Sequence, residues 1–245
     1  MLTAEIVIPV YNEEHDLRAS IRKLVDFARK VTSCRIAITI ADNGSADGTF
    51  AIARELEREY PEVCAVHLPD KGRGGALREV WSRSHADVVS YMDVDLSTNL
   101  KFFPLLIEGL SIGYDVAIGS RLLQASQTTR SLKREVLSRA YNTLVKMMFM
   151  NRFSDAQCGF KALRREVALE LLPLVENTRW FFDTELLLLA ERLGYRIFEV
   201  PVEWTDDLDS RVNILTTALE DVRGLLRIRL RRKPKPLARA TVSRT

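Results

Sequence analysis

Short apolar runs and helical patterns alternate through residues 4–120, and this alternation constrains the fold more than any other feature of the sequence. Apolar runs of strand length stand at 4–10, 35–41, 63–68, 87–92 and 115–118. Between them, apolar residues spaced three or four apart predict helices over 13–30, 49–60, 76–84 and 102–110. Strands that alternate with helices through short connectors form a parallel sheet covered by helices. We therefore expect an α/β fold with a mostly parallel central sheet.

The second half of the sequence is expected to be richer in helix. Helical spacing covers 134–150, 166–174, 182–193 and 212–230, and one more strand is expected at 196–200. No internal repeat or linker divides the chain, and 245 residues suit one large domain. We expect a single domain over residues 1–221, followed by a basic tail over residues 222–245.

Positive charge is concentrated in that tail. Residues 222–245 hold nine Arg or Lys and no Asp or Glu, so the net charge of +3 for the whole chain leaves −6 on the rest. A basic tail can bind nucleic acid or a membrane surface, or it can simply be solvated. No apolar stretch approaches the roughly 18 residues of a membrane span, so any membrane contact is expected to be peripheral. Three cysteines without paired spacing favour a reducing, cytoplasmic compartment.

Carboxylates follow two of the expected strands. Asp42 ends the second strand, and Asp93-Val94-Asp95 ends the fourth. Right-handed crossovers bring these strand ends to one edge of the sheet, where ligands bind in open α/β folds. A hard divalent cation takes carboxylate and phosphate oxygens, and it neutralises charge on a leaving diphosphate. Two solvated aspartates in a polar loop are the alternative, and this short pattern alone does not decide between them.

The motifs around these carboxylates resemble those of family 2 inverting glycosyltransferases. The matching segments, in the order and spacing of the family, are residues 9–13, 42–45, 93–95 and 119–121. Later segments resemble the dolichyl-phosphate sugar synthases, closer to the glucose branch than to the mannose branch, and they are residues 155–161, 182–187 and 200–204. The resemblance covers roughly residues 4–215.

The resemblance implies a Rossmann-like GT-A glycosyltransferase fold, and it implies transfer of a hexose to a polyprenyl or dolichyl phosphate with inversion. UDP-glucose is the favoured donor and GDP-mannose the second, with Mg²⁺ or Mn²⁺ as cofactor. The nucleotide sugar would be held by Pro9, Tyr11, Glu13, Asp42, Asp93 and Arg121. The metal would be held by Asp93, Asp95 and Gln157. The catalytic residues would be Asp93, Asp95, Arg121 and Asp183.

Basic residues gather around the start of the helix expected at 134–150. A helix N-terminus with basic side chains is an anion site, although most charge runs are solvated faces. In the synthases that the chain resembles, the corresponding segment receives the lipid phosphate. The candidate acceptor-phosphate residues are Lys133, Arg134, Arg139 and Arg211. A phosphate oxygen is already ionised near pH 7, so such an acceptor needs no general base.

An amphipathic pattern in residues 212–230 suggests how the chain reaches its lipid. Leu215, Leu219, Val222, Leu226 and Leu230 form one helical stripe, and Arg223, Arg227 and Arg231 form an adjacent line. Such a helix can lie on a membrane surface or dock as an ordinary helix. We expect peripheral contact with the cytoplasmic, inner face of the membrane, through this helix or through a membrane-protein partner.

Four other functions remain as alternatives. A family 2 transferase that acts on a sugar hydroxyl in polysaccharide synthesis would need a carboxylate base, for which Asp183 or Glu185 is available. A non-catalytic nucleotide-sugar-binding protein would share the same motifs. A nucleotidyltransferase is disfavoured because residues 11–14 are neither glycine-rich nor basic. A nucleic-acid binder rests only on the tail, and we expect no nucleic-acid partner. The glycine-rich run at 71–75 matches neither a P-loop nor the dinucleotide fingerprint.

Overall fold

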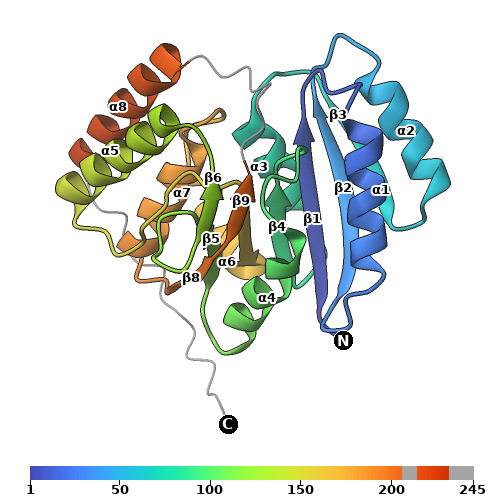
Figure 1. Ribbon diagram of the computed structural model, residues 1–245, viewed down its shortest axis with the longest axis horizontal. Coiled ribbons are helices and arrows are strands. Elements are labelled where there is room, and N and C mark those ends of the chain that lie inside the picture. The colour runs from blue at the N-terminus through green and yellow to red at the C-terminus, as the bar shows by residue number, and fades with distance from the viewer. Residues whose placement is uncertain (206–213, 232–245) are drawn as a thin grey trace.

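The computed structural model describes residues 1–205 and 214–231. Its centre is a seven-stranded sheet of order β3-β2-β1-β4-β7-β5-β8 (Figure 1). Every strand of this sheet runs in one direction except β7, which lies antiparallel between β4 and β5. The strands are β1 (Thr3–Val10), β2 (Arg35–Asn43), β3 (Val63–Leu68), β4 (Val88–Met92), β5 (Val116–Ser120), β7 (Phe160–Arg164) and β8 (Ile197–Pro201). The expected α/β fold with a mostly parallel sheet is confirmed.

Helices cover both faces of the sheet. One face packs on α1 (Leu17–Ala28), α2 (Thr49–Glu59), the short 3-10 turn η1 (Leu100–Phe102) and α4 (Phe103–Ser111). The other face packs on α3 (Arg73–Arg83), α6 (Arg165–Leu171) and α7 (Phe182–Arg192). The remaining helices, α5 (Leu132–Phe149) and α8 (Ile214–Leu230), lie side by side on the outside of this second layer (Figure 1).

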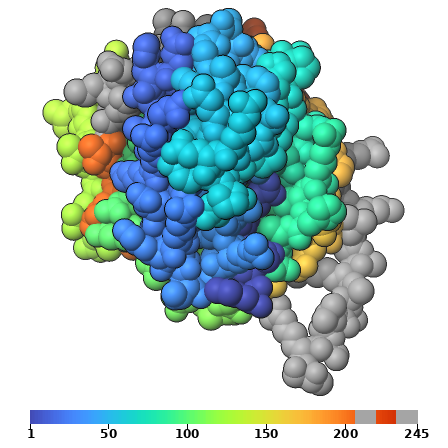
Figure 2. All heavy atoms as spheres, turned by 90° about the vertical axis from the view of Figure 1, so that its right-hand side faces the viewer, coloured from blue at the N-terminus to red at the C-terminus, as the bar shows by residue number. Residues whose placement is uncertain are grey.

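The strands are buried on both sides, which explains why they are continuous apolar runs rather than alternating ones. In β1, Ile6 and Ile8 face the core beneath α1 and α2, and Val7 faces the core beneath α3 and α7. All three are fully buried. The N-terminal third of the chain, from β1 to α3, covers most of the face shown in Figure 2.

Three strands were not expected from the sequence. Besides β7, a small two-stranded ribbon pairs β6 (Gln127–Thr129) with β9 (Glu203–Thr205). Thr98 forms a further bridge to Trp204, so the ribbon lies beside the loop after β4. The helix expected at 76–84 begins earlier, at Arg73, because the glycine-rich run forms its first turn.

The expected boundary between residues 221 and 222 falls inside α8. Leu225 and Ile228 of this helix are fully buried and belong to the second core. In the described part of the chain, no helix is both long and apolar enough to cross a bilayer. Arg211 and residues 232–245 lie outside the described residues.

Candidate functional site

Three loops meet at the carboxyl edge of the sheet, and Asn43 joins them. Its side-chain amide donates to Val10 O at 2.6 Å, and its Oδ1 accepts from Gly72 N at 3.0 Å. Asn12 links the first two loops again, because its side chain accepts from Ala46 N at 2.8 Å. Asn12 has a φ of 57°, which Asn tolerates better than most residues. The loops after β1, β2 and β3 are therefore held as one rigid edge.

The residues expected to hold a nucleoside lie on this edge. Asp42 is fully buried, and its Oδ2 lies 2.6 Å from His67 Nδ1 at the end of β3. The Lys71 ammonium lies 3.6 Å from the centre of the Tyr11 ring. Pro9 is buried in β1, in register with Ala41 of β2. Asp42 and Tyr11 thus lie at the ends of neighbouring strands.

The Asp93-Val94-Asp95 segment turns sharply out of β4. Asp95 is exposed and accepts a hydrogen bond from Ser97 N at 2.9 Å. Leu96 has a φ of 48°, a left-handed conformation that strains a residue of its kind. Asp93, Asp95 and Ser97 line a small hollow together with Gly159 and Trp204. The strained turn therefore places Asp93 and Asp95 beside one hollow.

Strand β7 supplies the floor beneath Asp93. The Asp93 amide donates to Gly159 O at 3.3 Å. A Cβ atom at position 159 would overlap the Asp93 carboxylate. Gly159 is therefore required for the close approach of this backbone to the acidic segment.

Two buried cations, missed by sequence reasoning, lie next to the carboxylates. Arg73 donates to Asp93 Oδ1 at 2.9 Å and also pairs with Asp183. Lys161 of β7 lies 2.8 Å from Asp183 Oδ1, and the Tyr91 hydroxyl donates to the same oxygen. A buried Lys or Arg is rarely found without a partner carboxylate. That rule could have flagged the Lys in an otherwise apolar strand, although not which carboxylate it meets.

Asp183 is enclosed by these groups. Its side chain is fully buried. Burial opposes its ionisation, but Arg73 and then Lys161 outweigh burial and hold the pKa of Asp183 below its usual range. Glu185 is also fully buried, accepts from Asn177 N at 2.8 Å, and pairs with Arg227 at 2.7 Å. Neither carboxylate is presented to solvent as a proton acceptor.

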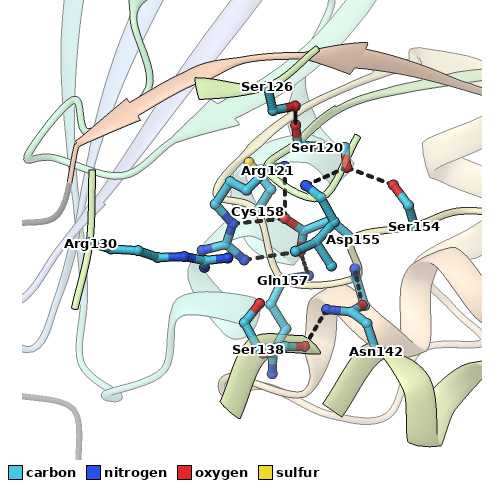
Figure 3. A network of polar contacts seen from close by, with 12 residues as sticks. Ser120, Arg121, Ser126, Arg130, Ser138, Asn142, Ser154, Asp155, Gln157 and Cys158 are labelled. Carbon is cyan, nitrogen blue, oxygen red and sulfur yellow. Dashed lines mark hydrogen bonds and ion pairs between the residues drawn. The ribbon is translucent and has the colours of Figure 1, made fainter. Parts of the chain in front are cut away.

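A second polar network lies at the end of β5 (Figure 3). Arg121 binds Asp155 through Nε at 2.7 Å and Nη2 at 2.9 Å. Its guanidinium carbon lies 5.4 Å from the centre of the Trp204 ring. Burial opposes ionisation of Asp155, but Arg121 outweighs it and lowers the pKa of this carboxyl to about 2. The bidentate pair fixes the direction of the guanidinium.

Of the basic residues near α5, Arg130 points inward. Its side chain is only 3% exposed, and it lies 6.0 Å from the Trp204 ring, pairing with Glu135. Figure 3 shows it reaching toward the Arg121 guanidinium, with the Ser138 hydroxyl directed at the pair. That hydroxyl is buried and has no hydrogen-bond partner among the described residues. By contrast, Lys133 and Arg139 are exposed, and Arg134 is half-buried.

Gln157 lies between this network and α8. Its side-chain amide donates to Asp221 Oδ2 at 3.0 Å, and its backbone amide donates to Asp155 at 3.1 Å. Burial raises the pKa of Asp221 to about 7. Gln157 therefore connects this network to the outer helix, and it is not among the residues that line the hollow beside Asp93.

The hollow beside Asp93 fits a hard divalent cation. Its volume of about 10 Å³ is close to that of a single water-sized sphere. Two carboxylates line it, and so does Ser97, whose buried hydroxyl has no hydrogen-bond partner among the described residues. No group of three His, Cys, Asp or Glu in residues 1–205 and 214–231 could hold a metal alone. The residues around the hollow thus offer oxygen ligands, but too few to hold an ion alone. This is typical of sites where Mg²⁺ or Mn²⁺ takes its remaining ligands from a substrate phosphate.

Comparison with known proteins places the chain among sugar-transferring enzymes. The family model described as glycosyl transferase family 2 matches residues 5–172. Glycosyltransferase AglD of Haloferax volcanii is 35% identical over 97% of this chain, which spans only 39% of that longer protein. The dolichyl-phosphate beta-glucosyltransferase of Mus musculus is 32% identical over 92% of this chain and 74% of its own length. The Saccharomyces cerevisiae enzyme of the same name is 26% identical over 92% and 73%.

Solved structures confirm the fold. Glucosyl-3-phosphoglycerate synthase from Mycobacterium tuberculosis, in complex with Mn²⁺ and UDP-glucose, superposes with a TM-score of 0.67. The match covers 93% of this chain and 79% of that one, at 19% identity. The central sheet and its helices therefore have the architecture of that enzyme.

Proposed function

Because this chain belongs to glycosyl transferase family 2, we propose that it transfers glucose from UDP-glucose to the phosphate of a polyprenol lipid. The observation that carries this proposal is that a pair of carboxylates and a pair of arginines both lie beside Trp204. The paired carboxylates Asp93 and Asp95 line one hollow with Trp204, and the cations Arg121 and Arg130 lie beside the same ring. The carboxylates would bind a metal ion with the donor diphosphate, and the two arginines would bind the phosphate of the acceptor.

The donor side rests on the rigid edge formed by the first three loops. Tyr11, Glu13 and Asp42 would hold the nucleoside, with Pro9 shaping the end of β1. Asp93 and Asp95 would hold Mg²⁺ or Mn²⁺, which neutralises charge on the leaving diphosphate when bound. Gln157 does not line that hollow, and it would join these ligands only if its side chain turned away from Asp221. The beta-glucosyltransferases among the relatives support glucose ahead of mannose, and UDP-glucose is the nucleotide sugar bound in the structural neighbour.

The burial and ion pairing of Asp183 and Glu185 favour a phosphate acceptor over a sugar hydroxyl. A hydroxyl would need a general base within hydrogen-bond reach. Asp183 and Glu185, the candidates for that base, are fully buried and paired with cations. An acceptor phosphate is already ionised, so its oxygen would attack the anomeric carbon directly while the bond from that carbon to the diphosphate breaks and UDP leaves, which inverts the configuration. We assign Asp183 the role of positioning Arg73 and Lys161.

The acceptor phosphate would lie between Arg121, Arg130 and Ser138. Two fixed guanidinium groups offset the repulsion between the acceptor phosphate and the donor diphosphate. The Ser138 hydroxyl, which has no hydrogen-bond partner within the described part of the chain, would donate to a phosphate oxygen. Lys133, Arg134 and Arg139 would line the outer approach to this place, and Arg211 would close over it.

The outer helices form a surface that suits a membrane. Exposed apolar residues run along both helices: Leu132, Val136, Leu137 and Met147 on α5, and Leu219, Val222, Leu226 and Leu230 on α8. Lys133, Lys146, Arg223 and Arg229 are exposed on the same helices. We call this surface the α5/α8 face. Its apolar stripes and basic rim fit an anionic lipid surface, and Ser138 of α5 connects it to the proposed acceptor site.

Arg227 of α8, and Arg231 directly after the helix, do not belong to that rim. Arg227 pairs with Glu185 and Glu176, and Arg231 pairs with Glu176. These contacts hold the helix against the domain. The three free cysteines fit a reducing compartment, so we place the reaction at the cytoplasmic face of the membrane.

A donor screen tests the proposed function. The purified protein is incubated with a polyprenyl phosphate, Mg²⁺ or Mn²⁺, and each of several UDP- and GDP-sugars. We expect a glucosyl lipid phosphate from UDP-glucose, with the anomeric configuration inverted in the product's NMR spectrum, and no product in the presence of chelator. Transfer to a sugar hydroxyl but not to the lipid phosphate would reject the proposed acceptor.

A further inference from the structure

The glycine-rich run at 71–75 has a structural purpose that explains its composition. A Cβ at position 72 would meet Thr178 O at 2.5 Å, and one at position 74 would meet the Phe182 side chain at 2.5 Å. The first turn of α3 therefore approaches the segment before α7 more closely than residues with side chains would allow. This approach places Arg73 directly beside Asp183.

Arg73 is hydrogen-bonded to Asp93, the carboxylate that a metal would need as a ligand. Its Nη1 donates to Asp93 Oδ1 at 2.9 Å, while its other nitrogen pairs with Asp183. The guanidinium carbon lies 4.4 Å from the centre of the Trp180 ring, and the side chain is 11% exposed. A planar guanidinium bridges two carboxylates in a way that an ammonium cannot.

We propose that Arg73 is a stand-in cation, which neutralises Asp93 while the site is empty and yields it when a metal arrives with the donor diphosphate. This rests on the metal site proposed above. Asp183 keeps hold of the guanidinium throughout, because Lys161 and Tyr91 fix Asp183 from its other side. Only the hydrogen bond to Asp93 has to break.

Charge balance explains why the exchange needs the diphosphate. Three carboxylates, on Asp93, Asp95 and Asp183, face two cations, on Arg73 and Lys161, so the empty cluster carries one negative charge. A divalent ion bound alone would change the net charge of the cluster from minus one to plus one, because the guanidinium of Arg73 stays within the cluster. The two negative charges of a bridging diphosphate return it to minus one. The metal should therefore bind together with the donor rather than before it.

Mn²⁺ binding, measured by calorimetry or by the loss of the free-ion EPR signal, tests this without any acceptor or turnover. We compare the wild type, Arg73→Gln, and Lys101→Gln as a control that loses one exposed cation paired with Glu203. Mn²⁺ has to break the charge-assisted hydrogen bond between Arg73 and Asp93 in the wild type. Arg73→Gln removes this bond, so Mn²⁺ should bind about tenfold more tightly in that variant when no nucleotide is present. The strengthening of Mn²⁺ binding by UDP should shrink in that variant, and Lys101→Gln should match the wild type.

Arg73→Lys guards against misfolding of the glutamine variant, since it leaves a positive charge for the buried Asp183. One ammonium cannot hold both carboxylates, so Mn²⁺ binding without nucleotide should again tighten, though by less. Circular dichroism and thermal melting establish which variants are folded. A folded Arg73 variant with wild-type Mn²⁺ affinity would overturn the stand-in role alone. A wild type that binds no Mn²⁺ even with UDP would remove the metal site as well.

Discussion

At the scale of single residues, Asp95 is the sharpest test of the metal site. It is exposed, and it accepts a hydrogen bond from the amide of Ser97, two residues away. Asp95→Ala should therefore leave the melting temperature almost unchanged while abolishing transfer, because the diphosphate would lose its bridging ion. Asp16→Ala removes an exposed carboxylate that caps no helix amide and should remain active. Wild-type turnover by Asp95→Ala, or by the native protein in excess chelator, would reject the metal.

The Arg121–Asp155 pair makes a prediction about pH. The pKa of Asp155 is about 2 in the folded protein against an ordinary value of 3.8, so the stabilisation from its ionised form is fully present above pH 4 and is lost as pH falls toward 2. Asp155→Asn leaves a buried arginine uncompensated and should lower the free energy of unfolding by about 3 kcal/mol at pH 7. In urea titrations, the difference from wild type should narrow by about 1 kcal/mol at pH 3. A difference that is independent of pH would contradict the assigned pair.

At the scale of secondary structure, two neighbouring glycines of α3 should respond in opposite ways to alanine. Gly75→Ala meets Thr178 at 3.6 Å, an ordinary contact, and should stabilise the helix by up to about 1 kcal/mol. Gly74→Ala collides with Phe182 down to its Cβ, so backbone must shift, at a cost of about 2 kcal/mol. That shift moves Arg73, so Gly74→Ala should also lose activity. Thermal melts and turnover measure both effects, and equal behaviour of the two variants would refute the close packing.

The elements that sequence patterns predicted well are those with their own periodicity. The strands of the parallel half and α1, α2, α4, α5 and α7 lie within a few residues of their expected positions, because each buries a continuous face. Strand β7 was missed because Lys161 interrupts its apolar run, and the reason for that lysine, Asp183, is distant in sequence. Arg73 was missed likewise, since its importance arises only when α3 packs on the segment before α7. Long-range pairing of charges leaves no local periodic signal.

At the scale of the whole molecule, the α5/α8 face should decide access to a lipid acceptor. Val136 and Leu226 are 64% and 51% exposed, so Val136→Glu with Leu226→Glu should leave the fold intact. Burial of two such side chains contributes about 1.5–3 kcal/mol each when complete, and basic neighbours add about 1 kcal/mol each at an anionic surface. The double variant should therefore lose at least about tenfold in sedimentation with anionic liposomes. Wild-type binding itself should weaken at high salt, because surface charges are screened.

Activity on two kinds of acceptor distinguishes a loss of membrane docking from a loss of catalysis in the same double variant. Transfer to a long-chain polyprenyl phosphate should fall with liposome binding, while transfer to a short, water-soluble phosphate should persist, since that acceptor reaches Arg121 and Arg130 without a membrane. The control is Ile112→Glu, an equally drastic change at a residue that is 62% exposed after α4, on the opposite face of the sheet. Ile112→Glu should behave as wild type in both assays. If the double variant kept its liposome binding and long-chain activity, the α5/α8 face would not be the docking surface, and a membrane-protein partner would have to deliver the lipid.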